Sequence, residues 1–290
     1  MKASGPVLLF LTALIWGCAF SAQSAAAEHI GPWTFTCIRN LIAAAALFFL
    51  CPLLDRMRGI STEKAKWPVK GGILCGIMLG SASMFQQAGI QYTTAGKAGF
   101  LTALYIVIVP LISIFTGKKP GKRMIAAVAL AFAGLYFLSF RGDFSFGTGD
   151  LLLVICAFLF AVHILVIDRY GAEDGVRLSC IQFLTAGIIC LIPMIVMERP
   201  AAADLRTAWF PIFYAGLVSS CAGYTLQILG QKDCDPSAAG LILSFESVFA
   251  ALSGFLFLHE RLSAAEIIGC ILMMAAVLTA QIKSSQEEIS

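Results

Sequence analysis

The sequence predicts an all-α membrane protein in which ten transmembrane helices form two inverted five-helix repeats around a central cavity. Three observations support this prediction. The composition is unusually apolar, ten apolar stretches have the length of a membrane span, and the two halves of the chain resemble each other.

The composition indicates that lipid is the main solvent of the chain. Of the 290 residues, 59% are hydrophobic and only 13% are charged, and the mean hydropathy is +0.87. Soluble domains are about 45–50% apolar and about a quarter charged, so this chain has too few charges for a water-exposed surface. The 10 cysteines form no CxxC pair and have no histidines at ligand spacing, so we interpret them as packing residues.

Membrane spans are predicted wherever about 20 consecutive residues are mostly apolar. Short connections that contain Gly, Pro and charged residues separate the spans. A cleavable signal peptide is an alternative for the first span, but that span has a counterpart in the second half. The ten predicted spans are Gly5–Ala25, Gly31–Leu54, Pro68–Ile90, Gly96–Thr116, Lys122–Phe140, Gly149–Ile167, Val176–Met197, Ala208–Gly230, Pro236–Leu258 and Ser263–Ile282.

The distribution of Lys and Arg predicts that both termini are cytoplasmic. With the N-terminus inside, most of these residues fall on the cytoplasmic side, as the positive-inside rule requires. The bias comes mainly from the connections after the second and fourth spans. Those connections and their flanks hold Arg56, Arg58, Lys64, Lys66, Lys70, Lys118, Lys119, Lys122 and Arg123.

The two halves of the chain match at offsets of 141 to 144 residues. Since each half has five spans, an odd number, the second copy must cross the membrane in the opposite direction. We therefore predict one repeat at 1–145 and another at 146–290, an architecture typical of secondary transporters. A chance likeness between apolar stretches is the alternative. The matched positions include Trp16-Gly17 with Phe160-Ala161, Thr36-Cys37-Ile38-Arg39 with Ser179-Cys180-Ile181-Gln182, Gln86 with Gln227, and Tyr105 with Glu246.

Several motifs resemble the EamA-type members of the drug/metabolite transporter superfamily. Ala13-Leu14-Ile15-Trp16-Gly17 followed by Arg39 is similar to the start of such proteins, and Phe245-Glu246-Ser247-Val248-Phe249-Ala250-Ala251 with His259-Glu260-Arg261-Leu262 is similar to their ninth span and the following loop. Ser247, where the family commonly has proline, and Lys118-Lys119-Pro120 depart from the pattern. The resemblance implies ten helices around a central cavity and the export or exchange of small metabolites, amino acids or drugs.

Two charged residues lie deep within predicted spans, where charges are rare and usually face a polar cavity. Glu246, ten residues into the ninth span, could bind an amino group of a substrate or carry a proton, or it could be structural. Arg39, eight residues into the second span, could hold a carboxylate, or it could pin adjacent helices.

Further candidate substrate-binding residues are polar or aromatic. Gln86 and Gln227 occupy equivalent positions in the repeats, and Tyr224 shares a helical face with Gln227. His163 has a side chain suited to proton transfer. Each could instead make only interhelical contacts. Trp16, which could stack on a substrate, and Tyr105, the repeat mate of Glu246, complete the set.

The sequence thus predicts a secondary carrier in the cytoplasmic membrane of a bacterium that exports or exchanges a small organic metabolite by alternating access. An amino acid is the first substrate class, and a broad-specificity drug or nucleotide-sugar-like carrier is the alternative. A passive channel and a membrane-embedded enzyme are weaker alternatives. We expect no enzymatic activity, catalytic residue, cofactor, bound metal or nucleic acid, because the corresponding motifs are missing. Protons are a candidate coupling ion, and the carrier is expected to act as a monomer or homodimer.

Overall fold

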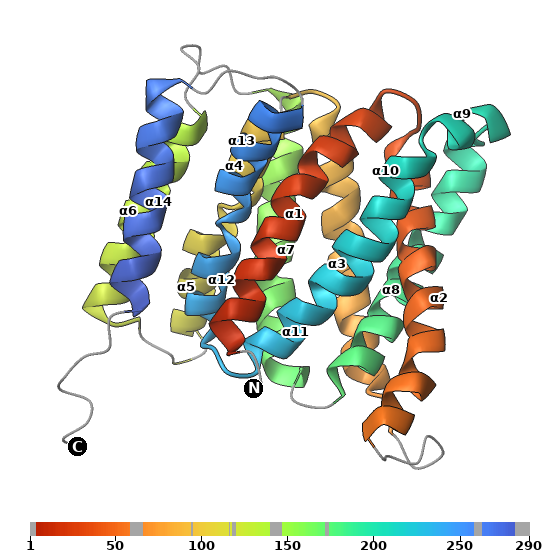
Figure 1. Ribbon diagram of the computed structural model, residues 1–290, viewed down its shortest axis with the longest axis horizontal. Coiled ribbons are helices and arrows are strands. Elements are labelled where there is room, and N and C mark those ends of the chain that lie inside the picture. Colours follow the sequence, from red (N-terminus) through yellow and green to blue (C-terminus); the bar gives the residue numbers. More distant parts are fainter. Residues whose placement is uncertain are drawn as a thin grey trace.

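The computed structural model describes residues 4–58, 66–93, 95–115, 117, 120–139, 147–171, 174–257 and 263–281. This described part of the chain is helical and contains no strands (Figure 1). Two segments, η2 and η3, are π-helical. The helices are α1 (Gly5–Ala27), α2 (Pro32–Arg58), α3 (Val69–Ile90), α4 (Ala95–Thr102), α5 (Tyr105–Phe115), α6 (Lys122–Ser139), α7 (Thr148–Tyr170), α8 (Gly175–Pro193), η2 (Met194–Glu198), α9 (Ala202–Thr207), α10 (Trp209–Phe213), η3 (Tyr214–Tyr224), α11 (Thr225–Gln231), α12 (Pro236–Leu243), α13 (Glu246–Phe257) and α14 (Ala264–Gln281).

Eight helical stretches among the described residues are long and apolar enough to cross a membrane. They correspond to the predicted spans one to four and six to nine. The fifth and tenth predicted spans are also helical, as α6 and α14, but neither is among the eight, and Ala264–Ala280 is a shorter apolar helix. The structure therefore supports a multi-pass membrane protein, and ten crossings remain a prediction.

The exterior of the helix bundle is strongly apolar, whereas many polar side chains are buried inside it. Phe115 is 90% exposed and Phe49 is 75% exposed, while Gln182 and His163 are fully buried. A soluble protein would instead bury its large apolar side chains and expose its polar ones. The arrangement fits a bundle whose outer surface contacts lipid and whose polar groups face its interior.

Two pairs of long helices, taken from the first and second halves of the chain, run in opposite directions. In Figure 1, α1 runs against α7, and α2 runs against α8. The start of α1 and the end of α14 lie on the same side of the bundle.

At the centre of the bundle, α3 packs closely against both α7 and α8. Three glycines of α3, Gly72, Gly76 and Gly80, face α8. A Cβ on Gly76 would lie 2.6 Å from the backbone oxygen of Gln182. Glycine is needed there because the two backbones approach too closely for any side chain. At the edge of the bundle α6 packs along α14.

The fourth and ninth spans, both predicted as continuous helices, are each broken near the middle. A turn at residues 103–104 separates α4 from α5, and a turn at residues 244–245 separates α12 from α13. At each break a backbone bond of the i to i−3 type replaces the α-helical one, from Ile106 N to Ala103 O and from Ser247 N to Ser244 O. The two breaks occupy matching positions, and Tyr105 and Glu246 are the first residues after them.

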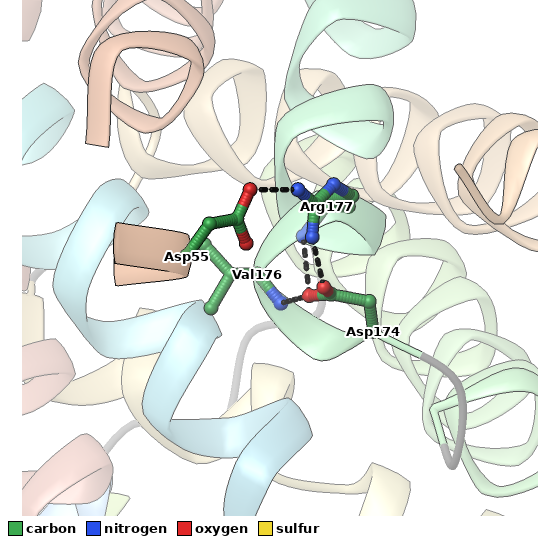
Figure 2. A network of polar contacts seen from close by, with 4 residues as sticks. All are labelled: Asp55, Asp174, Val176 and Arg177. Atoms are coloured by element: carbon green, nitrogen blue, oxygen red, sulfur yellow. Dashed lines mark hydrogen bonds and ion pairs between the residues drawn. The ribbon is translucent and has the colours of Figure 1, made fainter. Parts of the chain in front are cut away.

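Acidic residues at the ends of α2 and of the α8–η2 segment hold these helices together. The guanidinium of Arg177, near the start of α8, lies between the carboxylates of Asp55 and Asp174 (Figure 2). Figure 2 also shows the Val176 N–H donating to Asp174. These contacts join the end of α2 to the start of α8.

The opposite end of this helix pair is held in a related way. The carboxylate of Glu198 accepts hydrogen bonds from the backbone N–H groups of Trp33 and Thr34 at 2.9 and 2.7 Å. It thereby satisfies two donors at the start of α2 that have no intrahelical partner. Asp55 and Glu198 are themselves related by the 143-residue offset of the second and seventh spans.

Candidate functional site

All eight residues predicted to bind substrate line one cavity in the interior of the bundle. They come from α1, α2, α3, α5, α7, η3, α11 and α13, so most of the bundle contributes to the cavity wall. The eight are Trp16, Arg39, Gln86, Tyr105, His163, Tyr224, Gln227 and Glu246. The structure also places Ala19, Phe20, Gln23, Phe160, Ile164 and Ser219 on the cavity wall.

The cavity is narrow in this conformation. It leaves about 30 Å³ in which the centre of a water molecule fits. Since one water needs roughly 10–15 Å³ by this measure, the space is enough for about two waters. A metabolite of amino-acid size therefore requires the surrounding helices to move apart.

Glu246 and Tyr105 meet where the two broken helices resume. The Tyr105 hydroxyl donates to Glu246 Oε1 at 2.9 Å, and Glu246 is only 3% exposed. No described Lys, Arg or His forms an ion pair with this carboxylate. Glu246 therefore presents a carboxyl group to the cavity, with the Tyr105 hydroxyl as its one described hydrogen-bond donor.

Arg39 supplies positive charge to the same cavity. Its side chain is 3% exposed, and its guanidinium carbon lies 5.5 Å from the centre of the Phe35 ring. The Nε atom has no hydrogen-bond partner among the described residues, and no described carboxylate lies within 4.0 Å of the guanidinium. The Arg39 guanidinium therefore faces the cavity without a described counter-ion.

Gln86 and Gln227 hold matching places in the wall but differ in their contacts. Gln86 Nε2 donates to the hydroxyl of Thr102 at 3.4 Å, across from α3 to α4. The Oε1 atom of Gln227 is buried and has no partner among the described residues. The Gln227 carbonyl is thus a free acceptor next to the cavity.

His163 bonds to a residue that the sequence analysis did not select. Its Nε2 lies 3.0 Å from Oε1 of Gln182 on α8. If the amide is oriented this way, Nε2 is the protonated nitrogen. The other ring nitrogen, Nδ1, is buried without a partner in the described part of the chain. His163 therefore has one nitrogen held by the protein and one unused.

An aromatic cluster forms another part of the wall. The rings of Trp16 and Tyr224 have centroids 4.4 Å apart, and His163 and Phe183 meet Tyr224 edge-on at 5.9 and 5.6 Å. Trp16 Nε1 donates to the backbone oxygen of Ser219 at 3.3 Å. These contacts fix the Trp16 ring in place and leave it on the cavity wall.

Comparison with known proteins decides the family. The sequence profile of the EamA-like transporter family matches residues 3–140 and again residues 147–280. The chain belongs to the EamA-like transporter family. The resemblance to this family and to the drug/metabolite transporter superfamily predicted from the sequence is thereby confirmed.

Relatives of this EamA-like protein are named as transporters. An uncharacterized transporter of Archaeoglobus fulgidus is 33% identical over 276 residues, which cover 95% of this chain and 85% of the relative. The threonine/homoserine exporter RhtA of Escherichia coli K12 is 28% identical over 224 residues, covering 74% and 73%. A solved crystal structure that is 19% identical matches the whole of both chains with a TM-score of 0.79, which shows a shared fold.

Sequence reasoning missed several wall residues of the EamA-like cavity. Gln23 is seven residues after Trp16, two helical turns further along one face of α1, so this spacing could have identified it. Ser219 lies in the π-helical segment η3, whose widened turns no periodic pattern indicated. The motif at residues 259–262 lies outside the described residues.

Metal binding finds no support in the described part of the chain. No three His, Cys, Asp or Glu side chains there gather as a metal site. The cavity wall offers hydrogen-bond donors and acceptors, aromatic rings, one guanidinium and one carboxyl group.

Proposed function

We propose that this chain is a secondary carrier that exports or exchanges a small organic metabolite by alternating access. The observation that carries the proposal is the cavity itself, which lies inside the bundle, holds charged and polar side chains from both halves of the chain and is too narrow for a metabolite in this conformation. Carriers close such a cavity between exposures to either side of the membrane, whereas a passive channel keeps a continuous path.

We further propose ten spans arranged as two inverted repeats, 1–145 and 146–290. The family profile matches once in each half. The cavity wall pairs residues at the repeat offsets: Trp16 with Phe160, Ala19 with His163, Gln86 with Gln227, and Tyr105 with Glu246. A two-fold arrangement about an axis through the cavity accounts for this pairing. The same arrangement accounts for the matching helix breaks.

An amino acid is the first substrate class we propose. The wall offers both a guanidinium and a carboxylate, together with amide groups that can donate and accept hydrogen bonds. A relative that shares most of its length with this chain is named as an exporter of threonine and homoserine. A broad-specificity drug carrier is the second candidate, favoured by the aromatic cluster around Tyr224.

The proposed location is the cytoplasmic membrane of a bacterium, with both termini in the cytoplasm. The positive residues after the second span support this orientation. The start of α1 and the end of α14 lie on the same side of the bundle, which fits two termini in one compartment. Fusions of a phosphatase and of a fluorescent protein to the C-terminus test it. Fluorescence without phosphatase activity is expected, and the reverse result contradicts the orientation.

Counterflow in proteoliposomes tests the carrier itself. Vesicles loaded with unlabelled amino acids should accumulate the labelled compound transiently, and the initial rate should saturate with concentration. A channel gives neither behaviour. A change in the fluorescence of a pH-sensitive dye inside the same vesicles tests whether protons are coupled to transport. Light scattering of the purified protein tests the proposed monomer or homodimer.

A further inference from the structure

The one guanidinium and the one carboxyl group on the cavity wall have no counter-ion among the described residues. Arg39 and Glu246 are each 3% exposed, and no ion pair joins them to each other or to another described residue. A charge in the membrane interior is unfavourable without a partner, so an unpaired one normally faces a ligand or water. Here one guanidinium and one carboxyl group face the same narrow cavity.

A second arginine that is deeply buried among the described residues shows how this fold satisfies a structural guanidinium. Arg177 is also 3% exposed, but it lies between two carboxylates, those of Asp55 and Asp174 (Figure 2). Its guanidinium carbon also lies 5.5 Å from the ring centre of Trp67. Arg39 has an aromatic neighbour, Phe35, but no carboxylate. The contrast indicates that the missing partner of Arg39 comes from outside the protein.

Glu246 differs from Arg39 in having one partner within the protein. The Tyr105 hydroxyl occupies one of its oxygens at 2.9 Å. A carboxylate offers two oxygens with several acceptor positions, so the other oxygen remains for a donor in the cavity. A cationic ammonium group supplies such a donor and also neutralises the charge.

We propose that the cavity binds a zwitterion with a fixed polarity, its carboxylate against Arg39 and its ammonium group against Glu246. This inference rests on the proposed carrier function and specifies its substrate class. A singly charged solute pairs with one residue and leaves the other unpaired in a closed cavity, and a neutral solute leaves both unpaired. A zwitterion leaves neither unpaired, so the cavity can close around it.

The test uses L-threonine and two derivatives that each lack one of its charges. The methyl ester has no carboxylate, and the N-acetyl derivative has no ammonium group. Competition against labelled threonine counterflow is measured for the parent protein and for Arg39→Gln and Glu246→Gln. For each variant the result is the ratio of two inhibition constants. Such a ratio does not depend on how much of the carrier is folded. Arg206→Gln, on the exposed surface of α9, is the matched control.

In the parent protein and the control, threonine should compete at least tenfold better than either derivative. In Arg39→Gln, the inhibition constant of the methyl ester should come within about twofold of that of threonine. The N-acetyl derivative should still compete less well than threonine. Glu246→Gln should do the reverse. Arg39→Lys, which keeps the charge, should retain a preference of at least threefold for the free carboxylate.

Distinct results separate failure of this inference from failure of the carrier. Saturable counterflow in which both variants keep the parent ratios, or lose both discriminations together, overturns the assigned polarity and leaves the carrier standing. Better competition by a singly charged derivative in the parent protein also overturns the zwitterion. Absence of counterflow for every solute in the panel overturns the proposed function and this inference with it.

Discussion

Tyr105 and Glu246 are 141 residues apart in the chain, and the hydroxyl of one donates a hydrogen bond to the carboxylate of the other at 2.9 Å. Each is the first residue after the break in its span, and each is the other's mate in the predicted repeat. In a two-fold arrangement only residues close to the axis can touch their own mates. This contact therefore supports an axis that passes through the cavity wall at the two helix breaks.

Removal of the Tyr105 hydroxyl should uncover an energetic coupling with Glu246. Tyr105→Phe keeps the ring but removes the only described donor to a buried carboxylate, so we expect a loss of about 1.5–3 kcal/mol in the free energy of unfolding. A double-mutant cycle with Glu246→Gln, followed by chemical unfolding in detergent, measures the coupling. Tyr92→Phe, at a side chain that is 68% exposed, is the control. A coupling below about 0.5 kcal/mol contradicts the interpretation.

Gly17 is expected to tolerate no side chain, because α1 lies against α13 there. A Cβ at this position would be 2.2 Å from Cβ of Phe249 and 2.7 Å from the backbone oxygen of Glu246. Gly17→Ala should therefore lower stability by about 1–3 kcal/mol and reduce counterflow by displacing Glu246. Gly121→Ala, which meets nothing within 4 Å, should change neither. Parent-like melting and transport of Gly17→Ala would show that α1 moves aside easily.

The buried pair of Asp55 and Arg177 should contribute to stability more than any exposed charge does. Asp55→Asn leaves Arg177 with Asp174 alone. Complete loss of a buried partner costs about 3–5 kcal/mol, and we expect a smaller loss here because one carboxylate remains. Arg206→Gln on exposed α9 should lie within about 0.5 kcal/mol of the parent. Thermal melting in detergent compares the two, and equal melting temperatures would rule out this role.

Asp174 should make the stability of the protein depend on pH. Partial burial disfavours its charge, but bonds from the backbone N–H and guanidinium of Arg177 outweigh burial and lower the pKa of Asp174. A carboxyl group whose pKa is lower in the folded state stabilises the fold above its unfolded pKa, about 3.9. That contribution is lost as pH falls through the lowered folded value.

Asp174→Ala, which removes both the N-terminal cap of α8 and the charge, measures this effect. It should lower stability by about 1 kcal/mol at pH 7. The difference from the parent should shrink as the pH falls below about 4, where Asp174 is protonated in the unfolded chain, and should level off below its lowered folded pKa. Unfolding free energies at several pH values provide the measurement. A difference that stays constant down to pH 3 would assign the whole effect to the uncharged part of the cap.

Sequence reasoning selected the cavity residues well because each one stood out locally. Glu246 and Arg39 are charges within apolar stretches, and Gln86 and Gln227 hold equivalent places in the two halves. A polar group deep in a membrane span has few positions open to it other than the bundle interior. Their convergence on one cavity follows, whereas their roles in binding stay predictions.

Other features had no local signal. The breaks at residues 103–104 and 244–245 contain neither proline nor glycine, and the π-helical segment η3 interrupts an ordinary apolar run. Gln182 is the partner of His163 only because α7 and α8 bring them within 3.0 Å. Nothing in the spacing of 19 residues indicates that contact.

By itself the sequence determined that this is a multi-pass helical membrane protein, because span length and hydropathy add up along the chain and need no knowledge of neighbours. Its motifs resemble those of the EamA-like family, and that resemblance indicated the family. The tertiary structure alone decided which charges are paired. Arg177 has two carboxylates, and Arg39 has none among the described residues. The pairing of a side chain depends on how each helix is rotated and what packs against it. Helix packing is a non-local property, and apolar patterns constrain it only weakly.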